Sequence, residues 1–92
     1  MTNGQILDMV KANLSIASGT WNTYLENLIA VSRKEIAREG ITLNDDDISD
    51  CNLIVMYASY LWRKRAGDTA GMPRMLRYAL NNRVIAEKGA TS

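Results

Sequence analysis

The segment from about Asp46 to Ala66 constrains the fold of this chain more than any other part of the sequence. It contains neither glycine nor proline, and apolar side chains occupy more than half of its positions. This length favours a helix over a strand, although the β-branched pair Ile54 and Val55 is also common in strands. A helix that is apolar on most sides must be covered by protein, because water would otherwise face too much hydrocarbon. We therefore expect a long central helix, buried in its own domain or between subunits.

Helical spacing of apolar residues marks three further helices. The first is about ten residues long and carries the apolar residues of Ile6–Leu14. The second follows the 3, 4 spacing of one helical face over Trp21–Ile36 and should end at Gly40, which tolerates the left-handed conformation that ends helices. Pro73 should open the last helix, since a proline lacks the N–H that would be unpaired there. We expect that helix to fray by Gly89.

Polar residues mark the connections between these helices. Thr20 or Thr23 is placed to cap the second helix, and Thr23 has a glutamate three residues later, as a capping box requires. The aspartates at 45–47 look like a metal loop, but the spaced ligands, central glycine and closing glutamate of a calcium loop do not follow. We interpret them instead as complements to a helix dipole, with Asn44 or Asp45 as the cap. A loop over 67–71 precedes Pro73.

These segments predict an all-α fold: a small bundle of about four helices with a long central hydrophobic third helix. The 92 residues are enough for one core, so we expect a single domain over residues 1–92, with residues 89–92 as a flexible tail. The predicted core residues lie on the apolar face of each helix: Leu7, Val10, Trp21, Leu25, Leu28, Ile29, Ile48, Ile54, Val55, Ala58, Leu61, Leu76 and Leu80.

The composition argues against catalysis. The chain has no histidine and one cysteine, Cys51, so it lacks the commonest general base, an internal disulfide and a Cys/His zinc set. We expect no enzyme activity, no cofactor and no metal. No apolar run approaches the roughly 20 residues that cross a bilayer, and no basic-then-apolar leader opens the chain, which predicts a protein without a membrane segment in a reducing cytoplasm.

Charge is distributed unevenly along the chain. Residues 1–62 carry four basic and eight acidic side chains, whereas residues 63–88 carry seven basic and two acidic ones. Such polarity suits contact with nucleic acid, with an acidic protein surface or with the acidic end of a neighbouring copy. Arginine is favoured at protein and phosphate interfaces for its planar fork. The candidate interface or channel contacts are therefore Arg63, Lys64, Arg65, Arg74, Arg77 and Arg83.

A second interpretation is a small DNA-binding regulator of the helix-turn-helix type. The third and fourth helices would form the motif, with Arg74, Arg77, Asn81 and Arg83 reading DNA bases. The third helix is long and apolar for the first helix of that motif, and a net charge of +1 is low for a DNA binder.

The third and fourth helices also resemble a known family. The stretch Val55–Gly67, with aromatic and basic residues at its end, followed by Met72-Pro73 and a helix ending near Asn82-Arg83, is similar to the second half of tailed-phage head-tail connector proteins. These are also called adaptor, head-completion or DNA-packaging proteins. The opening stretch Ile6–Ile16 is similar to their first helix. In the family a leucine follows the proline, whereas here Arg74 and Met75 intervene before Leu76.

The resemblance implies a structural role in virion assembly. It implies a subunit of a homo-oligomeric ring of about a dozen copies, lying below the portal protein in the neck of a tailed phage or prophage. Such a ring extends the DNA channel, lets double-stranded DNA pass without reading its sequence, and joins the head to a neck, stopper or tail-completion protein. The implied location is the virion, after assembly in the cytoplasm of the bacterial host.

Overall fold

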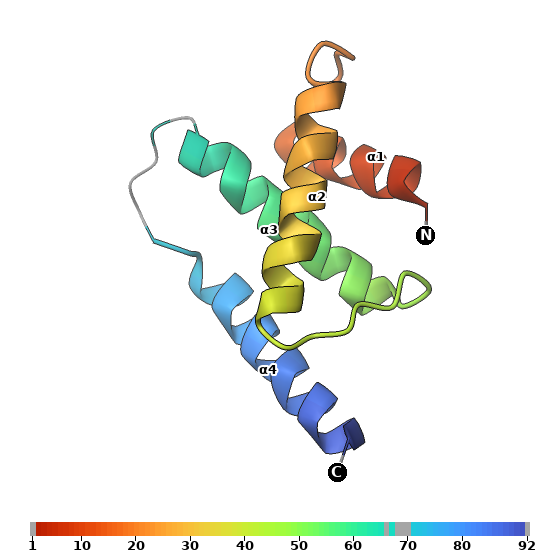
Figure 1. Ribbon diagram of the computed structural model, residues 1–92. Coiled ribbons are helices and arrows are strands. Elements are labelled where there is room, and N and C mark those ends of the chain that lie inside the picture. The colour runs from red at the N-terminus through yellow and green to blue at the C-terminus, as the bar shows by residue number, and fades with distance from the viewer. Residues whose placement is uncertain (1, 66, 68–70, 92) are drawn as a thin grey trace.

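The computed structural model describes residues 2–65, 67 and 71–91 (Figure 1). Within these residues the chain forms four α-helices and no strand: α1 (Asn3–Leu14), α2 (Asn22–Arg38), α3 (Ile48–Arg65) and α4 (Arg74–Thr91). The predicted all-α fold of four helices is confirmed.

Helix α3 lies at the centre of the bundle, since it packs against each of the other three helices. Helix α2 crosses α3 in Figure 1, and α1 packs against both of them. Helix α4 packs mainly on α3, and its C-terminal half projects away from the other helices (Figure 1). The molecule is therefore elongated, with extents of 45 × 30 × 17 Å.

The core contains most of the residues predicted for it. Those of α1, α2 and α4 that are buried as predicted are Leu7, Val10, Leu25, Leu28, Ile29, Leu76 and Leu80, and those of α3 are Ile54, Val55 and Ala58, while Leu61 is half-buried against them. The core also includes Ile6, Ile36, Ile41, Cys51, Leu53 and Tyr57, which were not in the predicted set.

Two predicted core residues are exposed. Trp21 precedes the first residue of α2 and is 37% exposed, because it lies at the rim of the bundle in a group of aromatic rings. Ile48 is 74% exposed because it is the first residue of α3, at the open end of the helix. Helical spacing assigned both residues to an inward face, but spacing does not show where the covering helices end.

The helix caps differ from the predicted ones. Thr2 and Gln5 form a capping box at α1: the Thr2 hydroxyl accepts from the Gln5 N–H at 3.2 Å and the Gln5 side chain accepts from the Thr2 N–H at 2.8 Å. The predicted threonine caps of α2 are wrong, since Trp21 occupies that position without a capping hydrogen bond from its side chain. At α3 the predicted cap lies too early in the chain, because Asp47 is the residue that accepts from the Ser49 N–H, at 2.8 Å.

The positions at which α2 ends and α4 begins were predicted more closely than the caps. Gly40 follows α2 and has a φ of 94°, in the left-handed region, as expected. The carbonyl of Pro73, directly before α4, accepts from the Arg77 N–H at 3.1 Å. Helix α4 runs to Thr91, two residues beyond the predicted limit at Gly89; of the predicted tail, residue 92 lies outside the described residues. Of the predicted 67–71 loop, residues 68–70 also lie outside them.

Candidate functional site

Helix α4 has two apolar faces, of which only one is buried. Leu76 and Leu80, at 1% and 0% exposure, face the core. Met75, Tyr78 and Ile85 are 72%, 55% and 67% exposed. The spacing of these three residues places them on one side of the helix, away from Leu80. We call Met75, Tyr78 and Ile85 the outer stripe. A row of exposed large apolar side chains is typical of a protein contact rather than of a solvated helix face.

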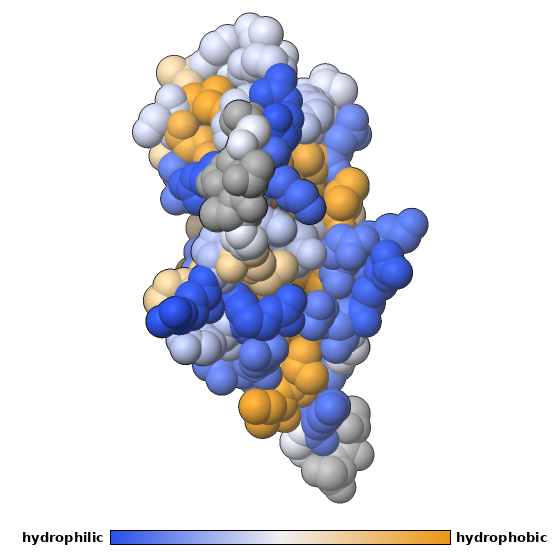
Figure 2. All heavy atoms as spheres, turned by 90° about the vertical axis from the view of Figure 1, so that its left-hand side faces the viewer, coloured by the Kyte–Doolittle hydropathy of each residue, from blue (hydrophilic) through white to orange (hydrophobic). Residues whose placement is uncertain are grey.

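The surface view shows where apolar groups gather on this side of the molecule. Figure 2 faces the side on which α4 lies, and apolar residues form a patch in its lower half, bordered by hydrophilic ones. The patch lies toward the C-terminal end of α4. A hydrophobic centre within a polar rim is the usual composition of a protein interface.

A groove of about 350 Å³ separates α3 from α4 beside the outer stripe. Leu53, Met56 and Ala79 supply apolar lining, and Asn52 and Asn82 add side-chain amides. Asn82 belongs to the same side of α4 as the outer stripe, so the groove and the stripe form one continuous surface.

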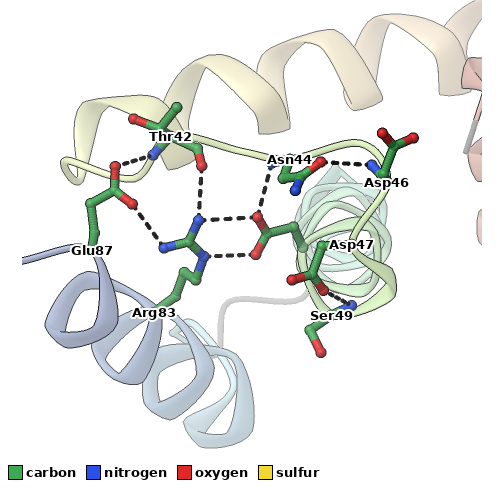
Figure 3. Close-up of polar contacts among 8 residues, drawn as sticks. Thr42, Asn44, Asp46, Asp47, Ser49, Arg83 and Glu87 are labelled. Carbon is green, nitrogen blue, oxygen red and sulfur yellow. Dashed lines mark hydrogen bonds and ion pairs between the residues drawn. The ribbon is translucent and has the colours of Figure 1, made fainter. Parts of the chain in front are cut away.

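Asp50 and Arg83, which also line this groove, form an ion pair that joins α4 to the rest of the fold (Figure 3). The Arg83 Nε donates to Asp50 Oδ1 at 2.7 Å, and an Nη donates to Oδ2 at 3.1 Å. The same guanidinium donates to the Thr42 carbonyl at 2.8 Å and to Glu87 at 3.0 Å. Glu87 in turn accepts from the Thr42 N–H at 3.2 Å. Arg83 thus links α4, α3 and the chain segment between α2 and α3.

The charges in this network shift one another's ionisation. The hydrogen bond from Arg83 holds the pKa of Asp50 below its ordinary value, despite the opposing effect of burial. Hydrogen bonds from Thr42 and then Arg83 lower the pKa of Glu87. The Asp50 hydrogen bond raises the pKa of Arg83 further above its already high value. All three groups are therefore charged at neutral pH and hold α4 in place.

The six predicted basic contact residues do not form one surface. Arg83 is committed to the network above, with 22% of its side chain exposed, and it is part of the fold. Arg77 pairs with Glu39 at 3.1 Å, which joins α4 to the end of α2. Arg63 and Arg74 are exposed.

Lys64 and Arg65 lie against aromatic rings at the end of α3. The Lys64 Nζ is 5.9 Å from the centre of the Tyr60 ring. The Arg65 guanidinium lies over three rings, of which the Trp21 ring is the nearest, at 4.7 Å.

In the fold, acidic side chains lie at the start of α3 and basic side chains lie at its end. Asp45, Asp46 and Asp47 directly precede the helix, and Arg63, Lys64 and Arg65 close it. Eighteen residues of α-helix span about 27 Å, so the two charged groups lie far apart. Each also complements the helix dipole, which accounts for part of this arrangement without any partner.

Sequence reasoning missed the outer stripe and the Asp50–Arg83 pair. From the fourth helix, the predicted core set contained Leu76 and Leu80, and no role was predicted for Met75, Tyr78 or Ile85. The ion pair joins residues 33 positions apart, and a single sequence carries no signal for that pairing.

The described residues contain neither a group of three metal-binding side chains nor a helix long and apolar enough to cross a membrane. Comparison of the chain with protein-family models, with curated proteins and with solved structures finds no match.

Proposed function

We propose that this protein is a structural subunit without enzyme activity, which assembles with copies of itself into a head-tail connector ring of a tailed phage or prophage. The observation that carries the proposal is the outer stripe, because three large apolar side chains remain exposed on a helix whose opposite side already buries Leu76 and Leu80. A domain of 92 residues buries a modest share of its surface, so covering such a stripe with a second copy would add to its stability.

The two charged ends of α3 support a head-to-tail arrangement of copies. An acidic end on one subunit can meet the basic end of the next, and this pairing uses different surfaces on the two partners. A contact between unlike surfaces generates a ring where the rotation closes and a filament where it does not. A ring is the assembly that the sequence resemblance implies.

The remaining partners are proposed from the resemblance alone. They are the portal protein on one side, a neck, stopper or tail-completion protein on the other, and double-stranded DNA in the channel. A subunit with a net charge of +1 is suited to letting DNA pass, because dense positive charge on a channel wall would grip the phosphates.

The helix-turn-helix regulator is less well supported. Arg83 and Arg77, two of its supposed base-reading residues, contact carboxylates of the same chain. The exposed side of α4 also carries Met75, Tyr78 and Ile85, whereas a helix that reads the major groove presents polar and basic side chains.

Electron microscopy tests the proposal directly. We expect closed rings in the concentrated protein, or on portal rings purified from the same virus when the two are mixed. The matched control is the Ile85→Lys variant, which places a charge in the outer stripe and should give dispersed particles under both conditions. Dispersed wild-type particles in both samples, together with tight binding to one DNA sequence at physiological salt, would favour the regulator instead.

A further inference from the structure

Three aromatic rings from two helices meet where α2 begins and α3 ends. The Trp21 and Trp62 rings stand edge to face with centroids 5.3 Å apart. Tyr24 lies 6.3 Å from Trp21 and 6.0 Å from Trp62. These separations and the steep angles between the rings are favourable for aromatic contact, and they hold the three rings as a fixed group.

A cation already occupies this group of rings. The Arg65 guanidinium lies 4.7 Å from the Trp21 ring centre, 5.1 Å from Tyr24 and 5.1 Å from Trp62. Each distance is within the range in which the negative face of a ring attracts a positive charge. Several rings around one cation form the kind of cage that proteins use to bind alkylated ammonium groups.

The cage lies at the surface. Trp21 is 37% exposed and Arg65 is exposed, while Tyr24 and Trp62 are half-buried against the core. Tyr24 and Trp62 are thus held against the core, whereas the Arg65 side chain is exposed. A cation–π contact at an exposed site is weak, so another cation can displace this side chain without unfolding the protein.

We propose that Trp21, Tyr24 and Trp62 form a binding site for an organic cation, an alkylated ammonium or a guanidinium group, which the protein's own Arg65 fills when no ligand is present. The tethered arginine competes with any ligand from solution, because its high effective concentration lowers the apparent affinity. The ligand is either a free small cation or the cationic side chain of another protein. This proposal does not depend on ring assembly, and its failure would leave the proposed function unaffected.

Tryptophan fluorescence provides the test, since both tryptophans of the chain belong to the cage. Arg65→Ala empties the cage, and we expect choline or an acetylated, amidated arginine to change the fluorescence of this variant in a saturable way. The wild type should need about tenfold more ligand, because Arg65 must leave first. A response to choline alone would identify a site for small cations, and a response to the arginine derivative would identify a side-chain site.

The controls separate cation binding from other effects. The neutral choline isostere 3,3-dimethylbutanol should not bind, and Arg63→Ala, which removes an exposed arginine from the same helix turn, should behave as the wild type does. Tyr24→Leu in the Arg65→Ala background removes one ring, keeps both tryptophans and should weaken binding. Arg65→Gln is a second emptied cage if the alanine variant is unstable. An emptied cage with no saturable response, or with the same response to the alcohol, would overturn the proposal.

Discussion

A carboxylate with 1% exposure, such as Asp50, is costly to bury unless its charge is paired and its oxygens are hydrogen-bonded. Here Arg83 contacts both oxygens, and the Asn44 N–H adds a third hydrogen bond at 2.9 Å. The pair is therefore satisfied. Removing Arg83 would leave the buried Asp50 carboxylate without a charge partner, and removing Asp50 would leave Arg83 with only the more exposed Glu87 at 3.0 Å. At the scale of single residues, this contact is the most specific link between α4 and the remaining fold.

Asp50→Asn should destabilise the protein by about 3 kcal/mol, because the Arg83 guanidinium then lacks a buried counter-charge. Urea unfolding followed by circular dichroism measures this change. The matched control is Asp46→Asn, which neutralises an exposed carboxylate near the same helix end and should change stability by less than about 0.5 kcal/mol. Equal free energies of unfolding for the two variants would show that the Asp50–Arg83 pair does not stabilise the fold.

The Asp50–Arg83 pair should also make the free energy of unfolding depend on pH. The folded pKa of Asp50 lies below its ordinary value of 3.8, so its contribution is complete above about pH 5 and is lost as the pH falls through the ordinary value toward the lowered folded value. The difference in unfolding free energy between wild type and Asp50→Asn should therefore be constant from pH 7 to pH 5 and shrink below pH 4. A difference that stays constant down to pH 2 would contradict the assigned shift.

At the scale of elements, α4 is the helix held by the fewest neighbours, since it packs mainly on α3. Its attachment relies on Leu76, Leu80 and the Arg83 network. Helices α1, α2 and α3, by contrast, pack against one another as a group. The α4 amides should therefore exchange with solvent through partial opening, before those of α3.

Leu80→Ala should lower the unfolding free energy by about 2 to 4 kcal/mol, since it removes a fully buried side chain and leaves a cavity. Hydrogen exchange should show the largest loss of protection within α4. Met75→Ala serves as the control on the same helix, because its side chain is 72% exposed and its loss should cost little. A uniform loss of protection over all four helices would mean that α4 does not open separately.

The elements were predicted from the sequence more reliably than their ends and faces. Apolar spacing identified four helices because each has at least one buried face, as Leu25, Leu28 and Ile29 do on α2. It failed at Trp21 and Ile48, because spacing gives the direction of a side chain but not the extent of the neighbouring helix. The cap of α3 was misplaced because four polar residues in a row, 44–47, offer equivalent hydrogen-bonding groups.

The candidate site could be predicted only in part. Sequence showed that residues 63–88 are basic, but not that Arg83 and Arg77 are paired with carboxylates on other elements. Nor could it show that Arg65 lies among Trp21, Tyr24 and Trp62, since these contacts depend on how α2 crosses α3. These contacts join residues that are far apart in the sequence. They depend on how the helices pack, which a single sequence does not show.

At the scale of the whole molecule, the outer stripe of α4 is an apolar surface that the described fold leaves exposed. The two ends of α3 carry opposite charge, although Asp45 pairs with Arg33 at 2.8 Å and Arg65 lies against the aromatic rings. In the assembly that we propose, the opposite charges at the two ends would favour a fixed orientation between copies, and burial of the apolar stripe would supply most of the binding free energy. The proposed assembly should therefore weaken in high salt without being abolished, since only the charge contribution is screened.

Sedimentation velocity over a concentration series tests the central claim, that the outer stripe is a contact between copies. The wild type should form larger species as its concentration rises, and Ile85→Lys should remain monomeric with unchanged circular dichroism. Val31→Lys, which places the same charge at an exposed apolar residue of α2, should assemble as the wild type does. A monomeric wild type at every concentration, or equal assembly of wild type and Ile85→Lys, would contradict the account.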